Sequence, residues 1–165
     1  MRSFGRYWLP PLLWMALIWG VSSDLGSVDN TAGPVGWIVT MLFPWATAAQ
    51  IELAHRVIRK FGHLTEYAIL AALWFRALYA GRRLPPTQSA LAALAISVGW
   101  AIADEVHQSF VPSRTASVVD VLVDSTGAAL ILFVVARTVA KLPSELDFEP
   151  RVEGVAQTVA EQVDA

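Results

Sequence analysis

The residues of this chain that are best suited to chemistry lie in the stretch ADEVHQSFVPSR, at the end of a long apolar run. The neighbouring carboxylates of Asp104 and Glu105 could exchange protons with a ligand, and the side chains of Gln108 and Arg114 could donate hydrogen bonds to one. Ionised groups are costly in hydrocarbon, so they normally face a partner or a water-filled cavity. The stretch therefore predicts a polar site, functional or structural, at the end of an apolar helix.

Two further groups of polar residues begin other apolar runs, one near residue 60 and one near residue 120. In a helix, residues spaced by three, four or seven positions share a face. The two groups show this spacing, which predicts one polar face on each helix. The first group is Lys60, His63 and Tyr67, with Glu66 beside them, and the second is Asp120, Asp124 and Gly127.

The composition places these groups in a membrane protein. Hydrophobic residues make up 55% of the chain and charged residues only 16%, whereas soluble domains average about 25% charged. A soluble helical bundle, the alternative, would carry polar stripes along whole helices. We predict an all-α, polytopic membrane protein with about four transmembrane helices, since four apolar segments approach the length that crosses a bilayer: Tyr7–Val21, Phe61–Tyr79, Ser89–Val106 and Ser117–Ala136.

Two segments near the N-terminus leave alternatives open. Tyr7–Val21 follows two arginines and precedes small residues, a pattern that is also typical of a cleaved signal peptide. We favour a retained anchor, because three remaining helices would make a thin bundle. Gly33–Ala49 is shorter and contains two prolines and two tryptophans. Tryptophan prefers the membrane–water interface, so we expect an interfacial or re-entrant element there rather than another full span.

The distribution of basic residues predicts the orientation of the bundle. With four spans, eight of the twelve lysines and arginines fall on one side, and that side is expected to be cytoplasmic. Both termini then lie in the cytoplasm, and the three polar groups meet at the outer end. Residues 143–165 carry six acids against one arginine. We therefore divide the chain into a transmembrane domain, residues 1–142, and an acidic cytoplasmic tail that is expected to be flexible.

The three polar groups resemble the motifs of VanZ-like membrane proteins. RKFGHLTEYAIL resembles K-x-x-H-x-x-E-Y, ADEVHQSFVPSR resembles D-E-x-x-Q-x-F-x-P-x-R, and DVLVDSTGA resembles D-x-x-x-N-x-x-G. Asp124 departs from the pattern, because the family often has asparagine there, and a role that needs a neutral donor is in doubt at this position. The family positions present here are Lys60, His63, Glu66, Tyr67, Asp104, Glu105, Gln108, Phe110, Pro112, Arg114, Asp120 and Gly127.

The resemblance covers most of residues 60–130 and implies a small multispan protein of the bacterial plasma membrane. It also implies a relation to glycopeptide (teicoplanin) resistance at the cell envelope, but no established reaction. From the outward-facing polar site we expect the protein to recognise or modify an envelope lipid or glycan intermediate, with membrane lipids or lipid-linked intermediates as partners. The alternative is a structural or accessory protein whose polar cluster only stabilises the helix bundle.

Roles follow from the chemistry of each side chain, and whether the protein is an enzyme stays open. His63, Asp104 and Glu105 are the candidate catalytic residues, because they can exchange protons. The candidate substrate-binding residues offer charges or hydrogen bonds: Lys60, Glu66, Tyr67, Gln108, Arg114, Asp120 and Asp124.

Metal and nucleic-acid binding are not expected. His63 and Glu66 have the spacing of metal-binding helical bundles, but the chain has no second His-x-x-Glu and places basic residues nearby. We therefore expect no metal and no cofactor. Nothing in the chain resembles a basic nucleic-acid-binding patch, and small residues in the third apolar segment leave an oligomer possible.

Overall fold

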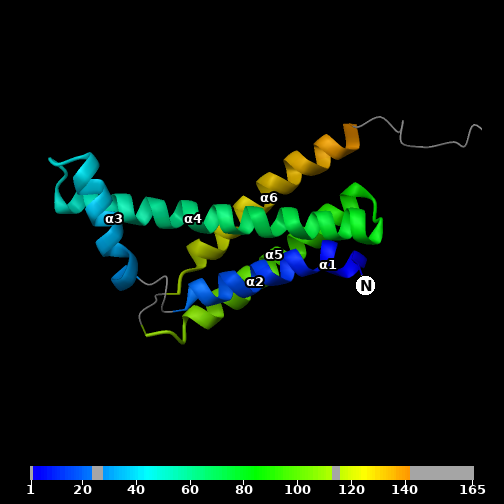
Figure 1. The fold of residues 1–165 in the computed structure, drawn as a ribbon, viewed down its shortest axis with the longest axis horizontal. Coiled ribbons are helices and arrows are strands. Elements are labelled where there is room, and N and C mark those ends of the chain that lie inside the picture. Colours follow the sequence, from blue (N-terminus) through cyan, green and yellow to red (C-terminus); the bar gives the residue numbers. More distant parts are fainter. Residues whose placement is uncertain (1, 24–27, 113–115, 142–165) are drawn as a thin grey trace, which may run out of the picture.

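The computed structural model describes residues 2–23, 28–112 and 116–141 of the chain. These residues form helices and short connections, with no strand among them (Figure 1), so the protein is all-α as the sequence predicts. The predicted tail and Arg114 lie outside the described residues. The helices are α1 (Arg2–Tyr7), α2 (Leu9–Ser22), α3 (Val28–Leu42), α4 (Ala48–Arg76), the π-helical turn η2 (Ala77–Gly81), α5 (Pro86–Gln108) and α6 (Val118–Lys141).

Helices α2, α4, α5 and α6 form the bundle. Figure 1 shows α2 and α5 running in one direction and α4 and α6 in the other. The C-terminal ends of α2 and α5 consequently lie near the start of α6 and the middle of α4. Helix α4 packs most extensively against α6, and both helices also contact α5.

Helices α1 and α2 form a nearly continuous rod. The backbone amide of Trp8 donates to the carbonyl of Phe4 at 2.9 Å, which bridges the break between the two helices. Pro10 and Pro11 fall in the first turn of α2, where a backbone N–H has no partner within the helix to lose. At 1.5 Å per residue, the rod from Arg2 to Ser22 is about 30 Å long, enough to cross the hydrocarbon core.

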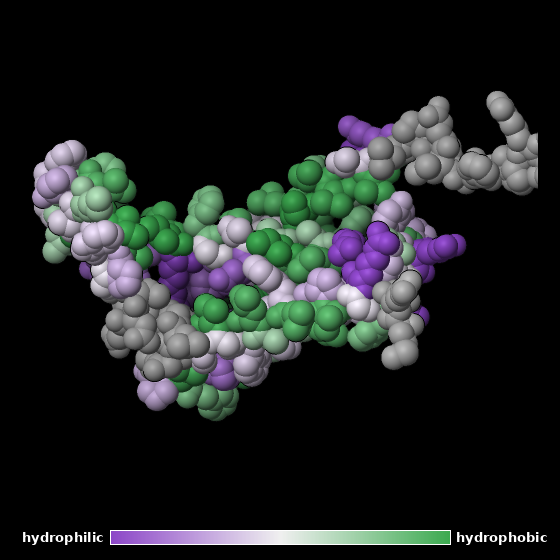
Figure 2. All heavy atoms as spheres, viewed as in Figure 1, coloured by the Kyte–Doolittle hydropathy of each residue, from purple (hydrophilic) through white to green (hydrophobic). Residues whose placement is uncertain are grey.

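The bundle distributes its side chains in the opposite way to a soluble protein. Large apolar side chains point outward, including Leu91, Leu130 and Phe133, each more than half exposed. Figure 2 shows apolar surface over α2 and α6. Soluble proteins rarely expose so much contiguous apolar surface. Helices α5 and α6 are both long and apolar enough to cross a membrane, and Leu9–Ser22 and Gly33–Leu42 are shorter apolar helices. The chain is an all-α membrane protein.

Helix α4 begins at Ala48, well before the predicted start of the second span at Phe61. The reason is a reciprocal N-terminal cap. The backbone N–H of Gln50 donates to the Thr47 hydroxyl at 3.4 Å, and the Gln50 side-chain oxygen accepts from the backbone N–H of Thr47 at 2.9 Å. Helix α3 lies across this early part of α4 (Figure 1). Trp37 of α3 and Trp45 of the connection to α4 are both exposed, which fits the interfacial element expected there.

Small residues bring α4, α5 and α6 close together. A side chain at Gly127 of α6 would overlap the backbone carbonyl of Leu64 in α4. On α5, four small residues at helical spacing are buried against the neighbouring helices: Ser89, Ala93, Ser97 and Ala101. Close backbone packing of this kind is typical of helices in membranes. It also shortens the distances between the polar side chains that these helices carry at one end.

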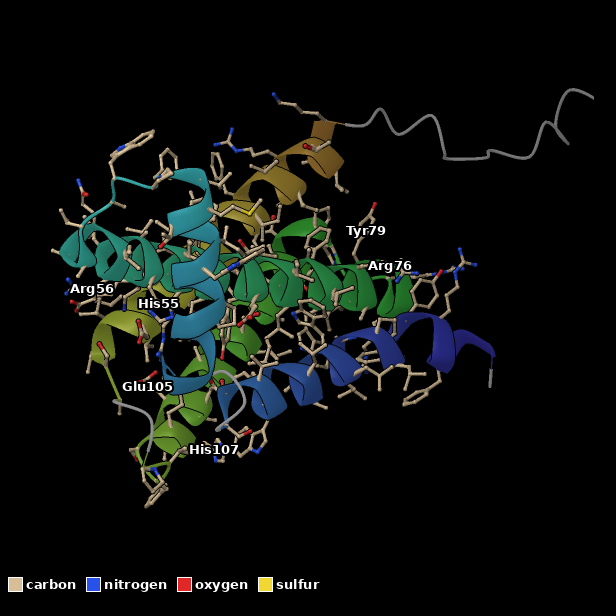
Figure 3. The ribbon with its side chains drawn as sticks, turned by 60° about the vertical axis from the view of Figure 1, so that its left-hand side comes forward. His55, Arg56, Arg76, Tyr79, Glu105 and His107 are labelled. Atoms are coloured by element: carbon tan, nitrogen blue, oxygen red, sulfur yellow. The ribbon has the colours of Figure 1, made fainter. Side chains whose placement is uncertain are left out.

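The opposite end of the bundle is basic. The guanidinium groups of Arg6 and Arg76 each lie 5.4 Å from the ring of Tyr7. Figure 3 shows Arg76 and Tyr79 at the end of the molecule opposite to His55, Arg56 and Glu105. The polar residues of interest and this basic group are therefore separated by the length of the bundle.

Candidate functional site

Polar side chains from four helices meet at the end of the bundle where α2 and α5 finish. Figure 2 shows hydrophilic atoms between α4 and the C-terminal end of α2. Most of these side chains are buried. We call the following ten residues the polar cluster: Ser22 of α2; Lys60, His63, Glu66 and Tyr67 of α4; Asp104, Glu105 and Gln108 of α5; and Asp120 and Asp124 of α6.

The link between α2 and α5 runs through Ser22, Asp104 and Gln108. The Ser22 hydroxyl donates to Asp104 Oδ2 at 2.7 Å. Gln108 Nε2 donates to Ser22 Oγ at 3.2 Å and to Asp104 Oδ2 at 3.0 Å. Because Asp104 and Gln108 are four residues apart on α5, both point toward the end of α2. One oxygen of each side chain has no hydrogen-bond partner among the described residues: Asp104 Oδ1 and Gln108 Oε1, both buried.

The link between α4 and α6 consists of two contacts one turn apart. Lys60 forms an ion pair with Asp120, in which the lysine side chain is 40% exposed and the aspartate 6%. One turn further in, His63 Nδ1 lies 3.3 Å from Asp124 Oδ1. The two atoms form an ion pair when the histidine is protonated, and neither makes a hydrogen bond to another described residue. The predicted faces Lys60–His63–Tyr67 and Asp120–Asp124–Gly127 thus point toward each other.

Glu105 contacts the chain that leads into α6. Its carboxylate accepts a hydrogen bond from the backbone amide of Ser117, the residue before α6 begins. The carbonyl of Ser117 in turn accepts from the amide of Asp120 at 2.8 Å. This geometry gives Glu105 a positioning role for the start of α6, since one of its oxygens is already engaged.

Tyr67 lies at the centre of the polar cluster. Its side chain is only 1% exposed, and its hydroxyl has no hydrogen-bond partner among the described residues. Four carboxyl groups act on that hydroxyl electrostatically, and they come from two helices besides its own: Glu66, Asp104, Glu105 and Asp124. Buried tyrosine hydroxyls usually find a partner, so an unpaired one among several carboxyls marks a place where a ligand could bind.

Acids outnumber bases in the described part of the cluster. It holds five carboxyl groups, and its cationic side chains are Lys60, which is paired with Asp120, and His63, which can carry a charge. The carboxyl groups belong to Glu66, Asp104, Glu105, Asp120 and Asp124. Arg114, which the sequence places in the same site, lies outside the described residues.

Neighbouring motif residues point elsewhere. His107 stacks on Trp19 of α2, with ring centroids 4.2 Å apart, and Figure 3 places it beside the end of α2. Phe110 is 80% exposed, and Pro112 is exposed too. Among the residues that the structure describes, no group of three or more His, Asp or Glu side chains is arranged to hold a metal ion.

Sequence reasoning missed Ser22 as a member of the site. The residue directly follows the first apolar segment, where small residues also fit a signal-peptide cleavage site. In the structure Ser22 is buried and bonded to Asp104. Further along the same helix, the Trp14 indole donates to the carbonyl of Glu66 at 2.9 Å. A hydroxyl at the end of an apolar run, level with the other polar groups, is the signal that could have identified it.

Comparison with known proteins gives one match. A family model described as VanZ/LLP1 matches residues 7–140, most of the chain and all of the polar cluster. This agrees with the resemblance drawn from the three motifs. No curated protein and no solved structure matches the chain.

Proposed function

This chain belongs to the VanZ/LLP1 family, and we propose that its polar cluster binds the headgroup of a membrane lipid or of a lipid-linked intermediate of the bacterial cell envelope. One observation carries the proposal: several buried polar atoms of the cluster have no hydrogen-bond partner among the described residues. They are His63 Nδ1, Tyr67 Oη, Asp104 Oδ1, Gln108 Oε1 and Asp124 Oδ1.

A network that only held the bundle together would satisfy its own members, because each buried unpaired polar group costs about 1–3 kcal/mol. The contacts of Lys60 with Asp120 and of Glu105 with Ser117 fit that structural role. Tyr67 and Asp124 do not, since both are about 1% exposed and hold an unpaired atom. The unpaired atoms of these side chains favour a binding site over a purely structural cluster.

The surroundings of the cluster suit a lipid. Apolar side chains cover the outside of the bundle, so acyl chains can lie against it. A shallow apolar groove is lined by Phe61 and Leu64 of α4 and Val123 of α6, and it reaches Lys60. A lipid whose chain lay in this groove would bring its headgroup to the polar cluster.

The pairing of His63 with Asp124 supports a second role, modification of the bound group. A histidine beside a carboxylate is a common arrangement for proton transfer, and His63 Nδ1 lies 3.3 Å from Asp124 Oδ1. Loss of turnover with retained lipid binding in a His63→Gln variant would separate modification from recognition. Equal turnover in the variant and the wild type would remove this second role.

The proposal places the cluster on the outer face of the bacterial cell membrane, with both termini in the cytoplasm. Basic residues at the opposite end of the bundle support this orientation. The family resemblance adds a role in glycopeptide resistance to the proposal. Such a role would also need a site that faces outward. Because the chain has no cysteine, single cysteines can report topology. Ala116→Cys should react with an impermeant reagent in intact cells, whereas Thr87→Cys should not; the reverse labelling would contradict the orientation.

Lipids that co-purify with the protein test the proposal. The full chain is purified in mild detergent, and bound lipids are identified by mass spectrometry for the wild type and for Asp104→Asn, which removes a charge at the centre of the site. Glu52→Gln is the control, since Glu52 is exposed on α4 and pairs with Arg56 at 3.7 Å. We expect one lipid class to be enriched on the wild type and on the control, and to fall at least tenfold on Asp104→Asn. Equal lipid profiles for all three proteins would contradict the proposal.

A further inference from the structure

We infer that the group recognised by the polar cluster is a primary ammonium, an inference that rests on the proposed headgroup site. The first reason is the balance of donors and acceptors among the unpaired atoms. Three of them, Asp104 Oδ1, Gln108 Oε1 and Asp124 Oδ1, only accept hydrogen bonds when the carboxyls are ionised. A primary ammonium carries three N–H donors and no acceptor, so it complements these atoms in number and in kind.

The three acceptors belong to one neighbourhood. Asp104 and Gln108 are hydrogen-bonded to each other through Gln108 Nε2, which fixes the amide so that its oxygen is left free. Asp124 lies on the facing helix α6, where its Oδ1 is 3.3 Å from His63 Nδ1 of α4. The Tyr67 hydroxyl, one turn beyond His63 on α4, also lacks a partner among the described residues. We therefore expect a single small cation to be held by groups from α4, α5 and α6.

The negative charge of this part of the site excludes an anionic ligand. A phosphate or carboxylate placed among Asp104, Glu105 and Asp124 would be repelled by them. The lysine that could offset this repulsion is already paired, because Lys60 contacts Asp120.

The same atoms also discriminate among cations. A quaternary ammonium has no N–H donor, and it is typically held by a cage of several aromatic rings. Tyr67 and His63 are the two aromatic members of the cluster, too few for such a cage. A divalent metal ion would compete for the carboxylates, but the described acids do not gather into a metal-binding set. The ligand class is thus a hydrogen-bond-donating amine.

Matched lipids test this inference on the wild-type protein. Detergent-solubilised full-length protein is titrated with phosphatidylethanolamine, phosphatidylcholine and phosphatidylglycerol of identical acyl chains, and binding is measured by native mass spectrometry. We expect phosphatidylethanolamine to bind at least tenfold more tightly than the other two. The preference should shrink below threefold in Gln108→Met, which keeps the size of the side chain but removes the amide oxygen, whereas Gln88→Met, on the exposed first turn of α5, should keep it.

The outcomes separate the inference from the function on which it rests. Equal binding of phosphatidylethanolamine and phosphatidylcholine, or preferred binding of phosphatidylglycerol, would overturn the amine while leaving a lipid site in place. If Ca2+, added as CaCl2, displaces phosphatidylethanolamine stoichiometrically and binds more tightly, the amine would be overturned in favour of a metal ion. Competition by free ethanolamine at equal concentration would support the amine and assign it to a soluble source. Absence of binding by all three lipids and by ethanolamine would overturn both the amine and the headgroup site.

Discussion

Gly127 of α6 lies against the backbone carbonyl of Leu64 in α4 so closely that no side chain fits between the two helices. Beside this crossing, Nδ1 of His63 on α4 lies 3.3 Å from Oδ1 of Asp124 on α6. The contact between two backbones therefore sets the distance across which the polar groups of α4 and α6 face each other.

Replacing Gly127 with alanine should destabilise the protein. The added methyl group meets backbone, which cannot rotate away, so α4 and α6 must separate; overpacking of this kind costs about 1–3 kcal/mol. Gly99→Ala is the control, because a side chain at Gly99 would meet nothing within 4 Å. Alanine favours a helix over glycine by about 0.5–1 kcal/mol, so this variant should keep or raise the unfolding temperature in detergent. A Gly127→Ala protein as stable as Gly99→Ala would contradict the close crossing.

The faces of α4 and α6 could be read from the sequence because spacing in a helix determines which residues share a face. Lys60 and His63 do point toward Asp120 and Asp124. The family and the all-α membrane fold were also correctly predicted. These features depend on local periodicity and on composition, both of which are present in the sequence alone.

Other features depend on packing that no local pattern encodes. Ser22 belongs to the cluster only because α2 ends level with Asp104. His107, three residues after Asp104, instead turns toward Trp19. Helix α4 starts at Ala48 because of a cap at Thr47, whereas an apolar run alone predicts a start at Phe61. The binding and catalytic roles given to individual residues stay predictions.

Breaking the pair between Lys60 and Asp120 from one side should cost more than removing both charges. Lys60→Met leaves the carboxylate of Asp120, 6% exposed, without its partner. Because the lysine itself is half-exposed, we expect a loss on the order of 1–3 kcal/mol in unfolding free energy, toward the low end of the range for buried pairs. The double variant Lys60→Met/Asp120→Asn should recover part of this loss. Additive losses in the double-mutant cycle would show that the two charges do not interact.

Two buried serines should respond differently to replacement by alanine. Ser22→Ala removes a donor to Asp104 and an acceptor for Gln108, so it should cost about 1–2 kcal/mol. Ser97 is equally buried on α5, but its hydroxyl has no partner among the described residues. Ser97→Ala should therefore leave stability unchanged or raise it. Equal losses for the two variants would mean that the bonds of Ser22 do not join α2 to α5.

Arg114 can be tested without knowledge of its position. If it binds an oxyanion of the headgroup with its planar fork, Arg114→Lys and Arg114→Gln should both fold and should both lose lipid binding, because lysine keeps the charge but not the paired donors. Bound lipid and unfolding temperature are measured together for both variants. Full lipid binding by Arg114→Lys would limit the arginine to balancing the charge of the nearby acids.

The central claim is that the polar cluster binds a ligand, and the hydroxyl of Tyr67 tests it most directly. That hydroxyl is buried and makes no hydrogen bond within the described part of the chain, so its removal in Tyr67→Phe should not lower the unfolding temperature of lipid-free protein. Tyr79→Phe, at the opposite end of the bundle, is the matched control. We expect Tyr67→Phe to bind at least fivefold less of the enriched lipid than Tyr79→Phe at equal or greater lipid-free stability. Unchanged lipid binding in Tyr67→Phe, or a loss of stability without a loss of lipid, would contradict the account.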